Sequence, residues 1–486
     1  MIHSSAPSTS LALLILVSVV VGTLLLIAVA FIRRWQQIRY ARYVHTLQRQ
    51  YRPIVAKVLS GIRSPSAIEA LRELSVADLD LLLDPLFSRR KLTERQRVFL
   101  QALCSELGLI TLWQRRTANG NPRATPSEGD RTRDFSTRAP VSHILRAKSI
   151  RNLGMLRYRP SWMLLANTLD DRHPDIQLVA LRSLAALGGL EGFQVLRDRL
   201  HAVVQGKASF PPVKSLLAAM STYDLSCVQA LVPSLRHTNR QIRLNTAQVL
   251  QVMVYRESVH QRRFDHTMDL LTPPMVELVL SKLAVDISAE IRARAAEILV
   301  HLTDPRTFSV LHNLLLDPQW SVRLSTLRAL TRTHRASAPL HKEIRDFLRD
   351  PHWQVREAAI KILISLGQEE KQEIYNYYLN SPDPGVREQI AMMIQRTGLL
   401  PVLVEDYCAG VKGVHALVVE ELASHSASVG LPGVLRHLAP GNRQRFMERF
   451  RPVAQSRKTL QENMGPAMEG TDGVHQALEY PPHLAA

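Results

Sequence analysis

The sequence is poor in cysteine and in aromatic residues. Its 486 residues include only three cysteines, Cys104, Cys227 and Cys408, which are odd in number and far apart. This spacing excludes a disulfide framework and a cysteine-based metal site, and it favours a reducing compartment. Aromatic residues make up 6% of the chain, whereas hydrophobic residues as a whole make up 46%. That composition is typical of leucine- and alanine-rich helices rather than of a β-sandwich.

The sequence strings that usually carry catalysis are also missing. There is no G-x-x-x-x-G-K-[ST] phosphate loop, no G-x-G-x-x-G, no H-E-x-x-H and no G-x-S-x-G, and no His-Glu dipeptide occurs anywhere. His260, Asp265 and His266 lie close together, but no third or fourth ligand is spaced to complete a metal site. We therefore expect no enzyme, no cofactor and no bound metal.

Residues 1–68 contain neither Asp nor Glu, and they hold one long apolar run. Residues 11–32 are uncharged, and at about 1.5 Å per residue they would cross a hydrocarbon core of roughly 30 Å. A cleaved signal peptide is the alternative, because Ala28-Val29-Ala30 resembles a cleavage site. The absence of Lys and Arg before Leu11 and the length of the run favour a retained transmembrane helix over residues 11–32.

Basic residues follow the apolar run directly. The first four are predicted to lie near lipid headgroups: Arg33, Arg34, Arg39 and Arg42. The positive-inside rule then leaves residues 1–10 as a short non-cytoplasmic tail and places the rest of the chain in the cytoplasm. Of the net charge of +18, residues 1–68 carry +8 and residues 112–159 carry +8, which leaves +2 elsewhere. The greater part of the chain is therefore nearly neutral.

A repeated unit organises the C-terminal two thirds of the sequence. A string of the form D-P-x-W-x-V-R occurs at 317–323 and again at 350–356, and a looser copy ends at Val386-Arg387. Marking the β-branched residue of each copy gives a series at 176, 242, 291, 322, 355 and 386, with steps of 66, 49, 31, 33 and 31 residues. A period in the low thirties is typical of a stacked helical array.

Each copy is predicted to be a pair of helices joined by a turn. Proline is favoured in the first helical turn and Asp can cap it, so Asp317 and Asp350 are expected to act as caps. After the turn, apolar residues recur at the spacing of one helical face: Val355, Ala358, Ala359, Ile362, Leu363 and Leu366. A single pair cannot bury that face, so neighbouring pairs must stack.

These strings resemble the HEAT repeat family, in its short form of about 30 residues that is similar to the repeats of PBS lyases. The resemblance implies an all-α fold, a right-handed α-solenoid of helical hairpins. It also implies a ladder of contacts between successive repeats, formed by Asp317, Arg323, Asp350, Arg356 and Arg387, with repeat-turn positions at Pro318, Trp320, Pro351 and Trp353. Both sets are structural and not catalytic in the family.

Composition divides the chain further. Residues 33–116 are predicted to be a basic juxtamembrane and helical region. Residues 117–140 are predicted to be a flexible basic linker that lets the helical array move relative to residues 33–116. The solenoid is expected over 141–430, and a C-terminal cap with a disordered tail over 431–486. The surplus residues Tyr255–Met275 inside the array predict a lengthened helix or a partner-contact loop.

Two functions remain open. The first is a membrane-anchored scaffold that binds a protein partner at the cytoplasmic face of the membrane. The resemblance to single-span bacterial HEAT-repeat proteins implies an inner-membrane protein accessory to envelope or exopolysaccharide biosynthesis, with a membrane enzyme such as a glycosyltransferase as the partner. The alternative is a nucleic-acid-binding solenoid, in which Arg323, Arg356 and Arg387 would line a basic face and Trp320 and Trp353 would stack on bases. The nearly neutral array favours the scaffold.

Overall fold

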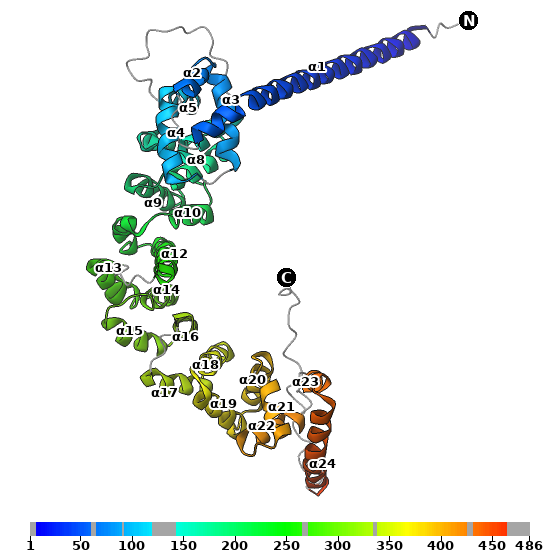
Figure 1. Ribbon diagram of the computed structural model, residues 1–486, viewed down its shortest axis with the longest axis vertical. Coiled ribbons are helices and arrows are strands. Elements are labelled where there is room, and N and C mark those ends of the chain that lie inside the picture. The colour runs from blue at the N-terminus through cyan, green and yellow to red at the C-terminus, as the bar shows by residue number, and fades with distance from the viewer. Residues whose placement is uncertain are drawn as a thin grey trace. The chain divides into compact units, whose positions relative to one another are not determined.

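The computed structural model describes residues 6–59, 65–89, 92–118, 142–264, 271–333, 338–424 and 431–463. Within these ranges the chain is all-α and contains no strand. The chain forms two compact units, unit 1 over Met1–Phe264 and unit 2 over Asp265–Ala486. Both units are stacks of helical hairpins (Figure 1). The predicted α-solenoid fold of hairpins is confirmed.

Unit 1 begins with a single long helix, α1 (Ala6–Leu59), which extends away from the other helices of the unit (Figure 1). It is the one helix of the described residues that is long and apolar enough to cross a membrane, a test that a signal sequence would also pass. Only its C-terminal part is packed: Leu47 and Val55 are buried, and α1 contacts α2 (Pro65–Arg72) and α3 (Val76–Arg89). The Tyr43 hydroxyl donates to Asp78 at 2.7 Å.

The rest of unit 1 is built from hairpins in which one helix of each pair stacks on its counterpart in the next. The stacked helices are α6 (His143–Met155), α8 (Pro174–Leu187), α10 (Val213–Met220) and α12 (Arg240–Phe264). Their partners are α5 (Leu109–Ala118), α7 (Trp162–Thr168, preceded by η2, Arg159–Ser161), α9 (Leu190–Val204), and η3 (Leu225–Leu231) with α11 (Val232–Leu235). α4 (Glu94–Glu106) packs on α5.

Unit 2 repeats this arrangement. The stacked helices are α14 (Ala289–Leu299), α16 (Trp320–Thr333), α18 (Trp353–Leu366) and α20 (Pro384–Arg396). Their partners are α13 (Pro273–Leu278) with η4 (Val279–Leu283), α15 (Arg306–Leu315), α17 (Ala338–Asp346) with η5 (Phe347–Arg349), and α19 (Gln368–Asn380). α21 (Leu399–Ala409), α22 (Val414–Ser424), α23 (Leu431–His437) and α24 (Pro440–Asn463) complete the unit.

The predicted helical face is buried as the repeat pattern requires. Val355, Ala358, Ala359, Ile362 and Leu363 are all buried in α18. The surplus residues after Tyr255 lengthen α12, which runs for 25 residues where α16 and α18 have 14. The last helix, α24, packs on α21 and buries Phe446, as a cap would. The tail that the sequence predicted to be unstructured from Gln455 is helical as far as Asn463, the end of α24, and residues 464–486 lie outside the described residues.

The expected linker of residues 117–140 differs from the structure in two respects. Its first two residues belong to α5, and Thr117 is buried there and donates to the Trp113 carbonyl at 2.7 Å. Residues 119–141 lie outside the described residues, but the helices on either side, α5 and α6, pack against each other as a hairpin. The helix before the linker, α5, therefore shares a core with the first repeat, whereas the sequence left open whether residues 33–116 belong to the array.

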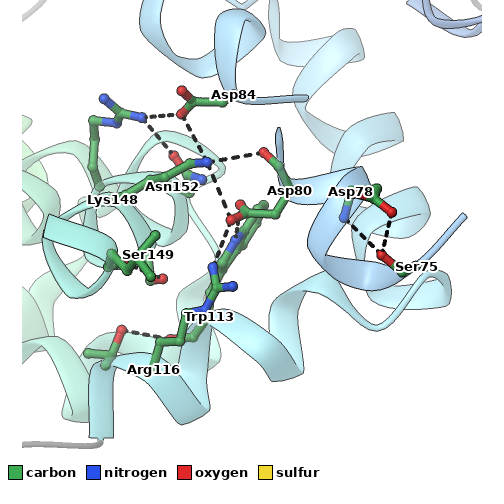
Figure 2. Close-up of polar contacts among 12 residues, drawn as sticks. Ser75, Asp78, Asp80, Asp84, Trp113, Arg116, Lys148, Ser149 and Asn152 are labelled. Atoms are coloured by element: carbon green, nitrogen blue, oxygen red, sulfur yellow. Dashed lines mark hydrogen bonds and ion pairs between the residues drawn. The ribbon is translucent and has the colours of Figure 1, made fainter. Parts of the chain in front are cut away.

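A buried cluster of charges fixes this junction (Figure 2). The Asp80 carboxylate on α3 accepts from Trp113 Nε1 at 2.8 Å and from Arg116 at 2.7 Å, and Lys148 Nζ lies 3.3 Å from it. Arg151 on α6 pairs with Asp84 at 2.7 Å. Because α5 and α6 both supply donors to an acceptor on α3, these three helices are joined through one carboxylate.

Candidate functional site

In six of the repeats one side chain ties down the turn that precedes the stacked helix. An Arg or Gln at this register position donates to the carbonyl oxygen six residues earlier, at 2.5–3.1 Å. The six donors are Gln177, Arg243, Arg292, Arg323, Arg356 and Arg387. The bond satisfies a carbonyl group that a helix terminus leaves without a partner. The repeated arginine is therefore used inside each turn.

Some of these arginines also reach the next repeat. Arg292 forms a two-pronged pair with Asp317 at 2.7 and 2.9 Å, and Arg323 does the same with Asp350 at 2.8 and 3.0 Å. Asp317 and Asp350 are buried in the turns. Each carboxylate accepts hydrogen bonds from one of these arginines and from the backbone N–H two residues later. The paired charges stabilise the contact between neighbouring turns.

The five predicted ladder residues thus have different partners. Arg323 and Asp350 contact each other, whereas Asp317 is held by Arg292, which the prediction left out. Arg356 donates to the Gln389 side chain at 2.8 Å, and Arg387 donates to the Ser381 carbonyl at 2.7 Å. In unit 1 a further cross-repeat pair joins Arg146 on α6 to Asp171, both buried.

The repeat turns differ from the expected caps. The helices begin at Trp320 and Trp353, three residues after the Asp, so Pro318 and Pro351 lie in the turn and not in the first helical turn. Trp320 stacks on His352 of the next repeat, with ring centroids 5.4 Å apart. Trp353, which we expected to pack between repeats, is half exposed. The membrane-proximal residues Arg33, Arg34, Arg39 and Arg42 are all exposed on α1.

No group of His, Cys, Asp and Glu that would hold a metal ion occurs among the described residues. His260 lies on the exposed end of α12, while Asp265 and His266 lie outside the described residues.

A groove in unit 1 is a concave site that the sequence did not indicate. Its volume is about 610 Å³, within the range of ligand-binding pockets. It runs along three successive turns between hairpins, at 157–160, 185–190 and 222–227, and reaches Glu94 and Gln101 on α4. Gln101 donates to the carbonyls of Leu156 and Arg157 at 2.5 and 3.2 Å, which fixes α4 to the first of these turns.

The groove presents more polar than apolar surface, with a small apolar floor and a charged rim. Leu187, Tyr223 and Cys227 are buried beneath it, and burial raises the pKa of the Tyr223 hydroxyl and of the Cys227 thiol, so both stay neutral. The Tyr223 hydroxyl donates to the Leu184 carbonyl at 2.8 Å. The floor is therefore fixed in shape and uncharged at neutral pH.

Four charged side chains lie along the rim. Arg157 is 3.9 Å from Glu94, whereas Arg159 forms no ion pair within the part of the chain that the structure describes. Asp224 lies at the far end, where it precedes η3. An apolar floor with charges of both signs at its edge suits a polypeptide segment better than a uniformly charged ligand.

Backbone conformation opens the middle of the groove. Gly188 and Gly189 have φ values of 72° and 89°, in the left-handed region that favours glycine. The Gly188-Gly189 pair ends α8 and starts α9 without side chains of its own. This pair was the only sequence signal for the groove, because the other walls come from turns far apart in the chain.

No protein-family model matches this chain, and no curated protein does. Among solved structures, it is similar to YibA of Escherichia coli, with 15% identity over 70% of this chain and 100% of that one, at a TM-score of 0.29. A Kap121p mutant has 13% identity over 74% of this chain and 39% of that one, at 0.33. A structure of the Pds5–Scc1 complex has 12% identity over 85% of this chain and 78% of that one, at a TM-score of 0.30. The fold assignment rests on the chain's own helix packing.

Proposed function

We propose that this protein is a membrane-anchored helical-repeat scaffold whose unit 1 groove binds an extended segment of a protein partner. The observation that carries the proposal is the groove itself, because three repeat turns and α4 combine to form one site with a fixed apolar floor. Stacked repeats commonly supply such long surfaces for partner binding.

The groove indicates the chemistry of the bound segment. A small or medium apolar side chain would cover Leu187 and Tyr223, and an acidic residue beside it would pair with Arg159. Main-chain groups of the segment would lie along the glycine pair, where no side chain blocks their approach. We therefore expect the recognised segment to combine apolar and acidic residues.

The anchor places this groove near a membrane. If residues 11–32 span the bilayer, the first packed residue of α1, Leu47, follows Ile32 by 15 positions, about 22 Å along the helix. Unit 1 then lies close to the cytoplasmic surface, with Arg33, Arg34, Arg39 and Arg42 facing anionic headgroups. A membrane enzyme such as a glycosyltransferase of envelope or exopolysaccharide biosynthesis is the partner class we propose.

The structure favours a protein partner over nucleic acid. Arg323, Arg356 and Arg387 were the residues that would line a basic face. Each is held by a turn carbonyl, and Arg323 and Arg356 are also held by a partner in the next repeat. Trp320 stacks on His352 and is not presented as an open ring. Nucleic-acid binding needs a row of available cations.

The test is co-purification of partners from detergent-solubilised membranes with the full chain. Two groove variants, Arg159→Glu and Ala186→Trp, change its charge and fill its space. The matched control is Arg172→Glu, which makes the same charge change at an exposed arginine in the turn between α7 and α8, away from the groove lining.

We expect a defined protein to be recovered with the parent chain and the control, and to fall about tenfold with either groove variant, a loss of about 1.4 kcal/mol of binding free energy. Recovery that is equal for all four chains would contradict the groove as the binding site. Nuclease-sensitive nucleic acid that is lost steeply with rising salt would support the alternative function instead.

A further inference from the structure

Unit 2 exposes large apolar side chains at the turns that lead into its stacked helices. Val285 and Ile287 in the turn before α14 are 68% and 96% exposed, Leu316 before α16 is 63% exposed, and Trp353 at the start of α18 is 50% exposed. We call these four residues the turn row. Single exposed apolar residues are ordinary, but apolar residues in three successive turns form a patch.

The arginine contacts hold these turns side by side. Arg292 donates to the carbonyls of Asp286 and Ile287 and also to the carboxylate of Asp317 in the next turn. Arg323 in the same way joins the carbonyls of Asp317 and Pro318 to Asp350 in the third turn. One guanidinium thus connects each pair of neighbouring turns, so the turn row is a continuous edge of unit 2.

The charged groups around the turn row are of both signs. The carboxylates of Asp317 and Asp350 are buried and paired, so two of the three turns present no open acid. In the first turn Asp286 is half-buried between Val285 and Ile287, and the exposed Glu290 accepts from the Ser288 hydroxyl at 2.7 Å. Lys282 and Arg349 are exposed and are the groups that would face an anionic surface.

The shape of the row favours a bilayer over a protein. A helix or a polyproline segment docks in a groove, whereas these side chains project from turn tips, with Ile287 almost fully exposed. Protruding aliphatic and tryptophan side chains with cations beside them are typical of elements that enter the boundary between headgroups and acyl chains.

We propose that the turn row contacts an anionic lipid bilayer, with Val285, Ile287, Leu316 and Trp353 entering the interfacial region and Lys282 and Arg349 facing the headgroups. The inference rests on the membrane anchor of the proposed function. Unit 2 then has a membrane contact of its own.

The test uses the full chain in nanodiscs that contain phosphatidylglycerol and phosphatidylcholine. A nitroxide is attached through Ile287→Cys, and the matched control is Gln368→Cys, an exposed position at the start of α19. Cys104, Cys227 and Cys408 are buried and are not expected to react. Accessibility to oxygen and to a water-soluble nickel chelate reports whether each label lies in lipid or in water.

We expect the label at 287 to be more accessible to oxygen than to nickel, and the label at 368 to show the reverse. Adding Leu316→Glu and Trp353→Glu should return the label at 287 to water, with the helical content unchanged. Equal nickel accessibility at 287 and 368 would overturn the proposal, and so would shielding of 287 from both reagents, which would indicate a protein contact. Incorporation into the discs tests the anchor separately, so the two failures are distinguishable.

Discussion

At the scale of residues, the repeated arginine has one constant partner and one variable partner. The bond to the carbonyl six residues earlier occurs in every repeat that carries the residue, because the turn geometry always leaves that carbonyl open. The contact with the next repeat is an Asp for Arg292 and Arg323 but a Gln for Arg356. Stability of the stack should therefore vary along unit 2.

Comparison of Arg323→Leu with Arg387→Leu tests this difference. Removal of Arg323 leaves the carboxylate of Asp350 buried without its guanidinium, which costs about 3 kcal/mol. Removal of Arg387 takes away one bond to a carbonyl, at a cost of about 1 kcal/mol. Hydrogen exchange of amides in α16 and α18 should accelerate much more in the first variant. Equal acceleration in both would contradict the role of the cross-repeat pair.

His201 gives unit 1 a predicted pH dependence. Burial, followed by the neighbouring His237, lowers the pKa of His201 below its ordinary value of 6.5, while Asp198 opposes the shift and Arg197 adds to it. The unfolded chain then binds a proton more readily than the folded chain, so folding stability falls as pH drops through 6.5 toward the lowered pKa. Above 6.5 the contribution is fully present.

His201→Gln should remove the contribution of His201 to the loss of folding stability at acidic pH. Thermal unfolding of the full chain, measured from about pH 7.5 down to about pH 5.5, should show a shallower fall in Tm for the variant. An identical fall of Tm with pH in both chains would rule out His201 as a source of the pH dependence.

The sequence was sufficient to find the register position but not its cross-repeat partners. Asp350 and Arg323 belong to the two best-matched strings and do contact each other. Arg292 was missed because its own repeat reads Asp286-Ile287-Ser288 and lacks the proline and tryptophan of the pattern. Arg146 was missed because its repeat precedes the first marked copy, at Ile176. Which carboxylate each arginine reaches depends on the packing of two hairpins, which no local pattern contains.

At the scale of elements, the closest helix contact is that of α6 with α8. A Cβ atom placed on Gly154 would lie 2.5 Å from the Cβ and 2.6 Å from the Cα of Ser183. Real Cβ contacts are not that short, and the second obstacle is backbone, so one helix would have to move. Gly154 therefore sets the distance between the first two stacked helices.

Gly154→Ala should destabilise unit 1 by about 2 kcal/mol, the typical cost of overpacking. The matched control is Gly433→Ala in α23, where nothing lies within 4 Å of the added atom and helix propensity favours alanine. Hydrogen exchange in α6 and α8 should increase in the first variant only. Unchanged protection of both helices in Gly154→Ala would show that their contact tolerates the added methyl group.

The helices themselves were largely predictable, whereas the groove was not. The burial of Val355, Ala358 and Ile362 follows from the helical spacing of apolar residues. The groove combines Gln101, the turn at 157–160, the glycine pair and Asp224, which are separated by more than a hundred residues. Their proximity is a consequence of repeat stacking, so only the folded chain brings them together.

At the scale of the whole molecule, unit 1 carries both the candidate membrane span and the groove. The buried cluster around Asp80 connects the helices next to α1 with the first repeat. α3 packs on α5 and α5 packs on α6, so in the proposed function a partner in the groove is connected to α1 through packed helices. This is the arrangement expected of a scaffold for a membrane-associated protein.

The most direct measurement is site-specific photo-crosslinking in intact membranes. A photoreactive amino acid is placed at position 186 in the groove lining, and separately at position 172 in the turn between α7 and α8. The account predicts one discrete protein adduct from position 186, resistant to nuclease, and none from position 172. No adduct at 186, or the same adduct from both positions, would contradict a partner bound in the groove.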